Sequence, residues 1–212
     1  MILIKDQEEI EGVRAAGRVV GEVFYEVEGE IKAGISTLEL DAKIESLIRK
    51  LKALPAFLGY RGYKYASCLS VNSEVVHGIP GSRKLAEGDI VGVDIGALLN
   101  GFYGDAARTY AIGPMNRKAS KLMQAGRECL ELAIRQARSG NHLGDISSAI
   151  ERHAKKCGFS VVRDLFGHGI GRSLHEDPLI PNFGEAGAGV EAGRPRRQRG
   201  RPQAATRARA PR

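Results

Sequence analysis

The chain has 212 residues, 42% of them hydrophobic, which is enough to bury one substantial core and favours a single globular domain. Its net charge of +7 lies entirely in residues 191–212, which hold eight Arg and one acid, so the other 190 residues, with 24 basic and 24 acidic side chains, do not resemble a nucleic-acid-binding body. No apolar run approaches the roughly 20 residues of a membrane span, and we expect neither membrane contact nor a signal peptide.

The first half of the chain predicts two helices and then strands. Apolar residues recur at three- and four-residue steps from Asp6 to Ile31, the pattern of one helix face. A second helix is expected from Ser36, because Glu39 three residues later completes a capping box, and Pro55 ends it. Three β-type runs follow, at Cys68 to Asn72, Ile90 to Leu98 and Phe102 to Ile112.

The same order of elements then begins again. Helices are expected at about 117–137 and 145–156, followed by a strand-like run from Phe159. Two helices followed by strands, twice over, indicate a structural repeat whose second copy is short of strands.

The composition changes abruptly after Val190. Residues 193–212 contain no aliphatic side chain larger than Ala and no aromatic, so they cannot bury enough apolar surface to offset the entropy of ordering. We therefore expect one domain over residues 1–190 and a disordered Arg/Gly/Pro-rich tail over 191–212. Binding of phosphate backbones by this tail is the weaker interpretation, because no aromatic is interleaved for base stacking.

Asp94 and Asp105 lie on two β-type runs joined by an Asn-Gly pair, the preferred two-residue hairpin turn. Pairing Leu99 with Phe102 sets Asp105 opposite Gly96, and the two carboxylates then share one face about 7–8 Å apart at Cα. Like charges this close need a cation or a proton between them. On hairpin geometry alone, metal binding and a pair of surface aspartates remain open as alternatives.

The remaining polar candidates are isolated residues. His168 stands in LFGHGIG, whose glycines let the backbone and a ligand approach closely, and imidazole combined with carboxylate suits Mn, Fe, Co or Zn. His77 occupies a loop and by itself reads as a surface histidine. His142 and His153 have no evident partners and are interpreted as structural. Three widely spaced cysteines fit neither a disulfide framework nor a zinc-type pair, which favours a reducing, cytoplasmic location.

Five motifs in a fixed order carry a family resemblance. FLGYRGY, VVHGIPG, GVDIG, FYGDAARTY and GHGIGRSLHEDPLIPNFG resemble the type I methionine aminopeptidases, members of the pita-bread metallopeptidase fold, with matches from roughly residue 3 to 185. The resemblance implies an α/β fold built from two pseudo-twofold halves, of which the second is incomplete here. It also implies hydrolytic removal of an initiator methionine by two divalent ions (Co, Mn, Fe or Zn), with nascent chains near the ribosome as partners.

The resemblance further assigns roles to individual residues. Metal ligands are implied at Asp94, Asp105 and His168, and histidines that contact the substrate and stabilise the reacting centre at His77 and His175.

A methionine pocket is implied as well. Its lining residues are Tyr60, Tyr63 and Cys68, with Phe57 and Leu174 completing the apolar wall. Aromatic and sulfur neighbours accommodate a thioether well.

The family's metal site also includes two glutamates from the second half, one of them in an IEP motif, and neither motif occurs here. Glu185 and Glu191 are the only acids after Asp177, and neither has a matching context. Three hypotheses follow: a working aminopeptidase, a non-catalytic binding protein on the same fold, and a family member inactivated by truncation or by a reading-frame change near residue 187. We favour a reading-frame change as the origin of the tail. For the ancestry of the chain we favour a working aminopeptidase.

Overall fold

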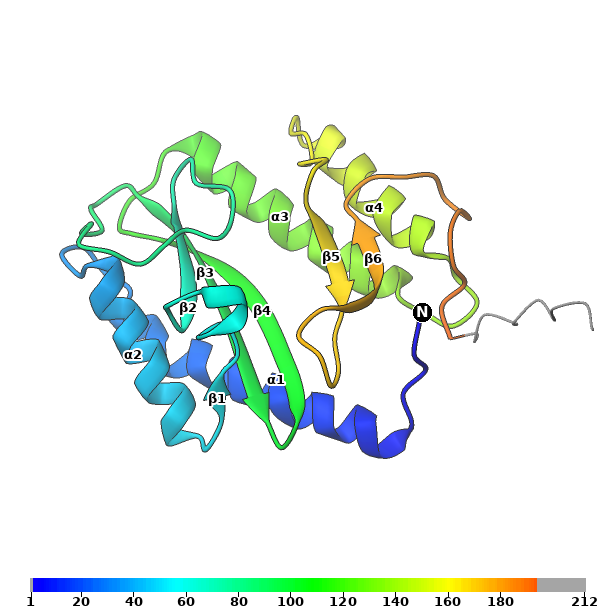
Figure 1. Ribbon diagram of the computed structural model, residues 1–212. Helices are drawn as coiled ribbons and strands as arrows, with labels where there is room; N and C mark the ends of the chain where they lie inside the picture. The colour runs from blue at the N-terminus through cyan, green and yellow to red at the C-terminus, as the bar shows by residue number, and fades with distance from the viewer. Residues whose placement is uncertain (1, 194–212) are drawn as a thin grey trace, which may run out of the picture.

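The computed structural model describes residues 2–193, and its elements form two groups that each begin with a pair of helices (Figure 1). The first group consists of α1 (Gln7–Val27), η1 (Glu28–Glu30), α2 (Thr37–Lys50), β1 (Leu54–Pro55), η2 (Tyr60–Gly62), β2 (Ser67–Val71), β3 (Ile90–Leu99) and β4 (Phe102–Ala111). The second consists of α3 (Arg117–Gln136), α4 (Leu143–Lys156), β5 (Phe166–Gly169) and β6 (Glu176–Pro181). Within the described range, no helix carries an apolar stretch long enough to cross a membrane.

Both helices of the first pair begin at a capping box. The Asp6 carboxylate accepts a hydrogen bond from the Glu9 backbone N–H at 2.9 Å. The Ser36 hydroxyl accepts one from the Glu39 N–H at 3.2 Å, and the Glu39 carboxylate accepts the Ser36 N–H at 2.8 Å. These reciprocal bonds satisfy N–H groups that the helix itself leaves unpaired, and they fix its first residue. The capping box predicted at Ser36 is confirmed.

Four antiparallel strands form the larger sheet, with β3 at its centre. β4 pairs with β3 along one edge, and β2 and β1 pair with it along the other. Asn100 and Gly101 join β3 to β4 with φ of 50° and 82°, the positive values that a tight two-residue hairpin turn requires. Leu99 pairs with Phe102, so the predicted register is confirmed.

The hydrophobic core lies between this sheet and the helices α1 and α2. Val91, Val93 and Ile95 alternate along β3 and have no exposed surface. Because successive side chains of a strand point to opposite faces, Asp94 between them leaves the sheet on the other side. The core therefore fixes the face on which the β3 carboxylate appears.

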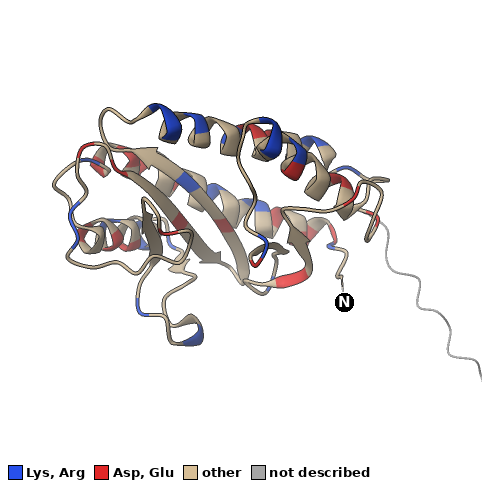
Figure 2. Ribbon diagram, turned by 90° about the horizontal axis from the view of Figure 1, so that it is seen from above, with Lys and Arg blue, Asp and Glu red and all other residues tan. Residues whose placement is uncertain are grey.

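The second helix pair is packed differently, because α3 and α4 contact each other but bury only small side chains. These are Ala125, Ala133, Gly144, Ser147, Ser148, Ala149 and Ala154. Acidic and basic residues are distributed over the helices of both pairs (Figure 2), in keeping with the neutral body expected from composition.

The strand predicted from Phe159 is wrong in its position. Residues 159–165 form no strand, and β5 starts at Phe166, opposite Pro181 of β6. Pro181 has no N–H with which to extend the ladder. The Phe159 N–H instead bonds the carbonyl of Ala154 at 2.9 Å, which returns the chain to the end of α4. Hydrophobic composition indicated a strand there, but no partner strand reaches that segment within residues 2–193.

The β5–β6 hairpin is anchored to the first group of elements. The Tyr103 N–H donates to the Gly171 carbonyl at 2.8 Å. Lys5, just before α1, pairs with Glu176 at 2.8 Å. Arg172 pairs with Glu9 at 3.0 Å. These contacts position the hairpin against the β3–β4 face that carries the aspartates.

The segment before residue 194 is paired with the loop that precedes α4. Glu191 forms an antiparallel bridge with His142, and the Ala192 N–H donates to the Asn141 carbonyl at 2.7 Å. Glu191 and Ala192, predicted to belong to the tail, are thus paired with the loop before α4. The rest of the predicted tail, 194–212, lies outside the described residues.

Candidate active site

Asp94 of β3 and Asp105 of β4 supply two carboxylates on one face of the sheet. Asp94 pairs with Ala107 and Asp105 with Gly96, as the hairpin geometry predicted. Burial, and next the charge of Asp105, raise the pKa of Asp94 to about 7. Burial also raises the pKa of Asp105, although His168 opposes this. Two partly buried carboxylates so close together are stable as a charged pair only with a cation or a donor beside them.

His168 of β5 faces this pair. Its Nδ1 lies 2.9 Å from the Gly169 carbonyl oxygen, and because a carbonyl only accepts, Nδ1 carries the proton. Nε2, the other ring nitrogen, faces the carboxylates and lies 3.5 Å from Oδ2 of Asp105. A backbone carbonyl that fixes the tautomer in this way is a common support for a metal-binding histidine. In the tautomer with its proton on Nδ1, Nε2 would be free to bind a cation shared with Asp105.

A register irregularity in the β5–β6 ladder falls between His168 and Gly169. Such bulges change the direction of a side chain. A Cβ on Gly169 would lie 2.4 Å from the Asp177 carbonyl oxygen, and one on Gly171 would lie 2.5 Å from the Lys5 side chain. These two glycines therefore allow the protein's own chain to approach closely, which is one of the two uses predicted for them.

His175 adjoins His168 and Tyr60. The two imidazole centroids are 4.2 Å apart, and the His175 ring stacks on Tyr60 with centroids 5.3 Å apart. Nδ1 of His175 is hydrogen-bonded to the Tyr60 hydroxyl at 2.9 Å, which leaves Nε2 for other contacts. Burial, and next the charges of His168 and Arg61, lower the pKa of His175. The ring is thus biased to its neutral form.

His77 reaches the same region from the loop after β2. It is an exposed residue with φ of 57°, and its charge contributes to lowering the pKa of Asp105 and of His175. A Cβ on the following Gly78 would lie 2.3 Å from the Leu69 carbonyl oxygen, so the loop is held tightly against β2. This close approach fixes the position from which His77 projects.

Cys68 adjoins Asp94, and Tyr63 interacts in turn with Cys68. Cys68 pairs with Asp94 across β2 and β3 and is buried, and this burial raises the pKa of its thiol to about 11. The Tyr63 hydroxyl donates to the Ser67 carbonyl at 2.9 Å, and its pKa is raised, above all by burial. Both side chains are therefore neutral at ordinary pH, as the wall of an apolar pocket requires.

The expected apolar wall residues have different surroundings. The Phe57 ring packs over Gly96, where a Cβ would lie 2.5 Å from Cε1 of the ring, so this glycine permits the ring to lie against β3 next to Asp94. Leu174 is almost fully buried. In the sequence it lies directly before His175. Both therefore lie on segments that also carry the candidate site.

Asp41 of α2 was not singled out from the sequence, yet it supports the pocket. Its buried carboxylate accepts the N–H groups of Ala66 and Ser67 at 3.1 and 2.8 Å and the Ser67 hydroxyl at 2.7 Å. These bonds fix the start of β2, one residue before Cys68. The sequence offered one indication of this role: Asp41 lies on the apolar side of the predicted helix, where a charged side chain needs polar partners.

The donor set fits a divalent ion. Asp94, Asp105 and His168 offer carboxylate oxygens and one imidazole nitrogen, ligands that suit Mn, Fe, Co and Zn. Among residues 2–193, no three ligand atoms that include two of these residues all lie within 4.8 Å of one another, so Asp94, Asp105 and His168 must move closer together to share an ion. The described chain thus brings three candidate ligands to one region of this face.

The interpretation of His153 as a histidine without partners is wrong. Its Nε2 lies 2.7 Å from Glu128 Oε2 and 3.4 Å from Cys157 Sγ. Cys129 and Cys157 are both half-buried. The available sequence signal was the four-residue spacing of His153 and Cys157, which places both on one face of a helix.

Residues 11–198 match the model of metallopeptidase family M24. Over 190 residues the chain is 47% identical to the methionine aminopeptidase of Clostridium acetobutylicum, covering 89% of this chain and 76% of that protein. It is 46% identical over 189 residues to methionine aminopeptidase 1 of Bacillus subtilis, covering 89% and 76%. The crystal structure of methionine aminopeptidase from Thermotoga maritima superposes with a TM-score of 0.88 at 47% identity, covering 90% of this chain and 77% of that one.

Proposed function

Because the chain belongs to metallopeptidase family M24 and has the pita-bread fold of its methionine aminopeptidases, we propose that its site binds a polypeptide that begins with methionine and hydrolyses the first peptide bond. The observation that supports this most directly is the convergence of Asp94, Asp105 and His168 from three different strands. Nothing in core packing requires two buried carboxylates and an imidazole at that place, whereas a metallopeptidase does.

Asp94, Asp105 and His168 would hold the metal. A divalent ion at such a site acts as a Lewis acid and lowers the pKa of water toward neutrality. The raised pKa of Asp94 shows that its charged form is unfavourable when buried beside Asp105. A bound cation would neutralise the pair and so remove this repulsion. Co, Mn, Fe and Zn all suit these ligands. A second ion requires carboxylates beyond the three residues named, so residues 2–193 support one ion.

His175 and His77 would contact the substrate. With Nδ1 held by Tyr60, His175 keeps Nε2 for the peptide, and its lowered pKa favours a neutral ring whose Nε2 would hydrogen-bond to the substrate. His77 faces the same region from the opposite loop. Tyr60, Tyr63 and Cys68 would enclose the methionine side chain, since aromatic rings and a neutral thiol suit a thioether.

Newly made polypeptides are the substrates that carry an initial methionine. We therefore assign the reaction to the cytoplasm, on chains emerging near the ribosome. The neutral charge of residues 1–190 gives the domain no general affinity for nucleic acid.

Methionine release from a Met-Ala-Ser peptide tests the proposal, with Mn²⁺ or Co²⁺ added and a Leu-Ala-Ser peptide as the substrate control. The chain is to be assayed with the segment after Gly187 replaced by the corresponding C-terminal part of a methionine aminopeptidase, which supplies the remaining length of the relatives. Asp94→Asn is expected to lower the rate at least about 100-fold. Asp164→Asn, which changes an exposed aspartate, serves as the matched control.

The proposal fails if the joined protein folds and binds metal but releases no methionine. It also fails if Asp94→Asn cleaves as fast as Asp164→Asn.

A further inference from the structure

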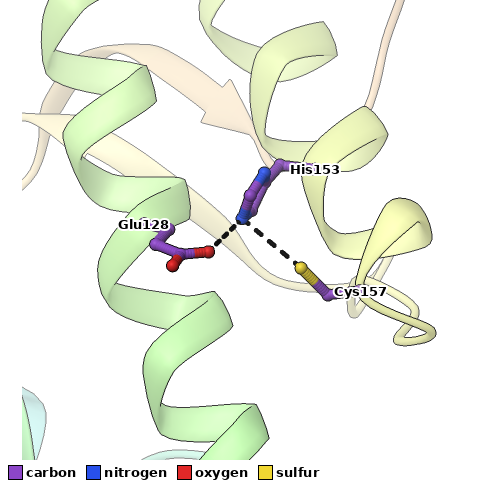
Figure 3. A group of neighbouring side chains, drawn as sticks. All are labelled: Glu128, His153 and Cys157. Atoms are coloured by element: carbon purple, nitrogen blue, oxygen red, sulfur yellow. Dashed lines mark hydrogen bonds and ion pairs between the residues drawn. The ribbon is translucent and has the colours of Figure 1, made fainter.

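Three potential metal ligands meet between α3 and α4, the second helix pair (Figure 3). Glu128 comes from α3, and His153 and Cys157 come from α4 and the residue that ends it. Residues four apart on a helix lie on one face, so the imidazole and the thiol both point toward α3. Nε2 of His153 lies 2.7 Å from Oε2 of Glu128 and 3.4 Å from Sγ of Cys157.

This cluster is the only group found among residues 2–193 in which three such ligand atoms all lie within 4.8 Å of one another. It contains neither Asp94 nor Asp105 and no residue of the sheet. The side chain of His153 is 19% exposed and that of Glu128 is 40% exposed, and Cys157 is half-buried. An ion from solvent therefore has access, while the packing of two helices holds the ligands near one another.

The distances suit a small tetrahedral ion. With bonds of about 2.0–2.1 Å to nitrogen and oxygen and about 2.3 Å to sulfur, tetrahedral zinc separates N from S by about 3.6 Å and N from O by about 3.3 Å. The observed N to S distance of 3.4 Å is already close to that value. The N to O distance of 2.7 Å must open by roughly half an ångström, which the exposed Glu128 side chain allows.

The carboxylate of Glu128 is also oriented by a second residue. Gln124, one turn earlier on α3, donates from Nε2 to Oε1 of Glu128 at 2.9 Å. Oε2 is thereby left to face His153. Support of this kind from outside the ligand set fixes ligand direction at many metal centres.

We propose that Glu128, His153 and Cys157 form a metal site for a thiophilic divalent ion, Zn²⁺ in the first place, which links α3 to α4. A thiolate, an imidazole and a carboxylate suit zinc or cobalt better than Mg²⁺ or Mn²⁺. On binding, Cys157 releases its thiol proton to solvent and coordinates as the thiolate, and water completes the fourth position. The link adds stability where this helix pair buries only small side chains.

The alternative is a plain ion pair between Glu128 and His153 with the thiol in contact. In that case the cluster needs no metal and gains nothing from one. Lys156 contributes to lowering the pKa of Glu128, and its positive charge would then also help to hold the carboxylate. The two interpretations differ in whether the Cys157 sulfur bonds to an added ion.

Cobalt absorption distinguishes them, because a thiolate bound to Co²⁺ gives a charge-transfer band in the near ultraviolet. Titration is to be done in the Asp94→Asn/Asp105→Asn background, which removes the aspartate ligands of the first centre. We expect one Co²⁺ per chain with this band. Cys157→Ser should abolish the band, and His153→Ala should weaken Co²⁺ binding at least about tenfold, since even the loss of a supporting residue costs that much.

Cys129→Ser is the matched control. Cys129 lies next to Glu128 on α3, but its sulfur turns to the Ile150 carbonyl at 3.6 Å and is not one of the three ligands. The Cys129→Ser variant should therefore keep the charge-transfer band. Thermal melts supply a second readout: Zn²⁺ should raise the melting temperature of the Cys129→Ser variant but not that of Cys157→Ser, provided both melt alike without metal.

A band that survives Cys157→Ser overturns the proposal. So does the absence of a band together with an unchanged melting temperature when Zn²⁺ is added.

Discussion

The two groups of elements begin alike, with a pair of helices, but differ in what the helices bury. α1 and α2 pack against a four-stranded sheet, and every member of the principal hydrophobic cluster lies between Val19 and Ile112. α3 instead leaves Leu122, Leu130 and Ile134 exposed by 44%, 59% and 63%. An amphipathic helix thus predicts an apolar face, but only a partner surface turns that face into core.

The same difference divides the candidate site. The carboxylates rest on the β3–β4 hairpin, whose strand β3 packs Val91, Val93 and Ile95 into the core. His168 and His175 instead come from a two-stranded hairpin held by two ion pairs and one backbone bond. We infer that the aspartate half of the site is rigid, and that the histidine half depends on what else packs against the second group.

The largest effect is expected from completing the second group. Replacing the segment after Gly187 with the C-terminal part of a methionine aminopeptidase should raise the rate of methionine release at least about 100-fold over the chain as given, because an added general base alone contributes that much. The melting temperature should rise as well, since α3 would gain a partner for its apolar face. If the chain as given cleaves as fast as the joined one, residues 2–193 already hold a complete site.

Truncating one large side chain in each group measures the difference in packing. Ile95→Ala should lower the free energy of unfolding by about 2–5 kcal/mol, because Ile95 has no exposed surface. Leu130→Ala should change it by less than about 0.5 kcal/mol. Urea unfolding of both variants provides the values. Equal losses would show that α3 is packed as tightly as β3 in solution.

A smaller effect is expected from Asp41, which ties α2 to β2. Burial raises the pKa of Asp41 in the folded chain, so folding favours its protonated form. Its contribution to stability is therefore greatest below the unfolded pKa near 4 and falls as pH rises through the folded value. Asp41→Asn should flatten the dependence of the free energy of unfolding on pH from the unfolded pKa upward. An unchanged slope would contradict the assignment.

Local sequence predicted what depends on local rules. The Asn100-Gly101 turn set the register of β3 and β4, and with it the shared face of Asp94 and Asp105, because a two-residue loop leaves no freedom in pairing. The capping box at Ser36 likewise gave the start of α2.

Contacts between distant segments could not be derived in this way. The cluster of Glu128 and His153 joins residues 25 apart and depends on how α3 lies on α4. The hydrogen bond from the Ser67 N–H to Asp41 likewise joins distant residues and depends on how α2 packs against β2. The segment from Phe159 had a strand composition but no partner strand, and a strand forms only with one.

Calorimetric titration of Mn²⁺ into the chain tests the central claim most directly, with Cys157→Ser present so that the first centre is observed alone. The account predicts fewer than two ions per chain, bound weakly, because the three predicted ligands Asp94, Asp105 and His168 are too few to fill the coordination of two ions. Asp105→Asn should abolish this binding and Asp164→Asn should leave it unchanged. Two tight sites, or binding that survives Asp105→Asn, would contradict the account.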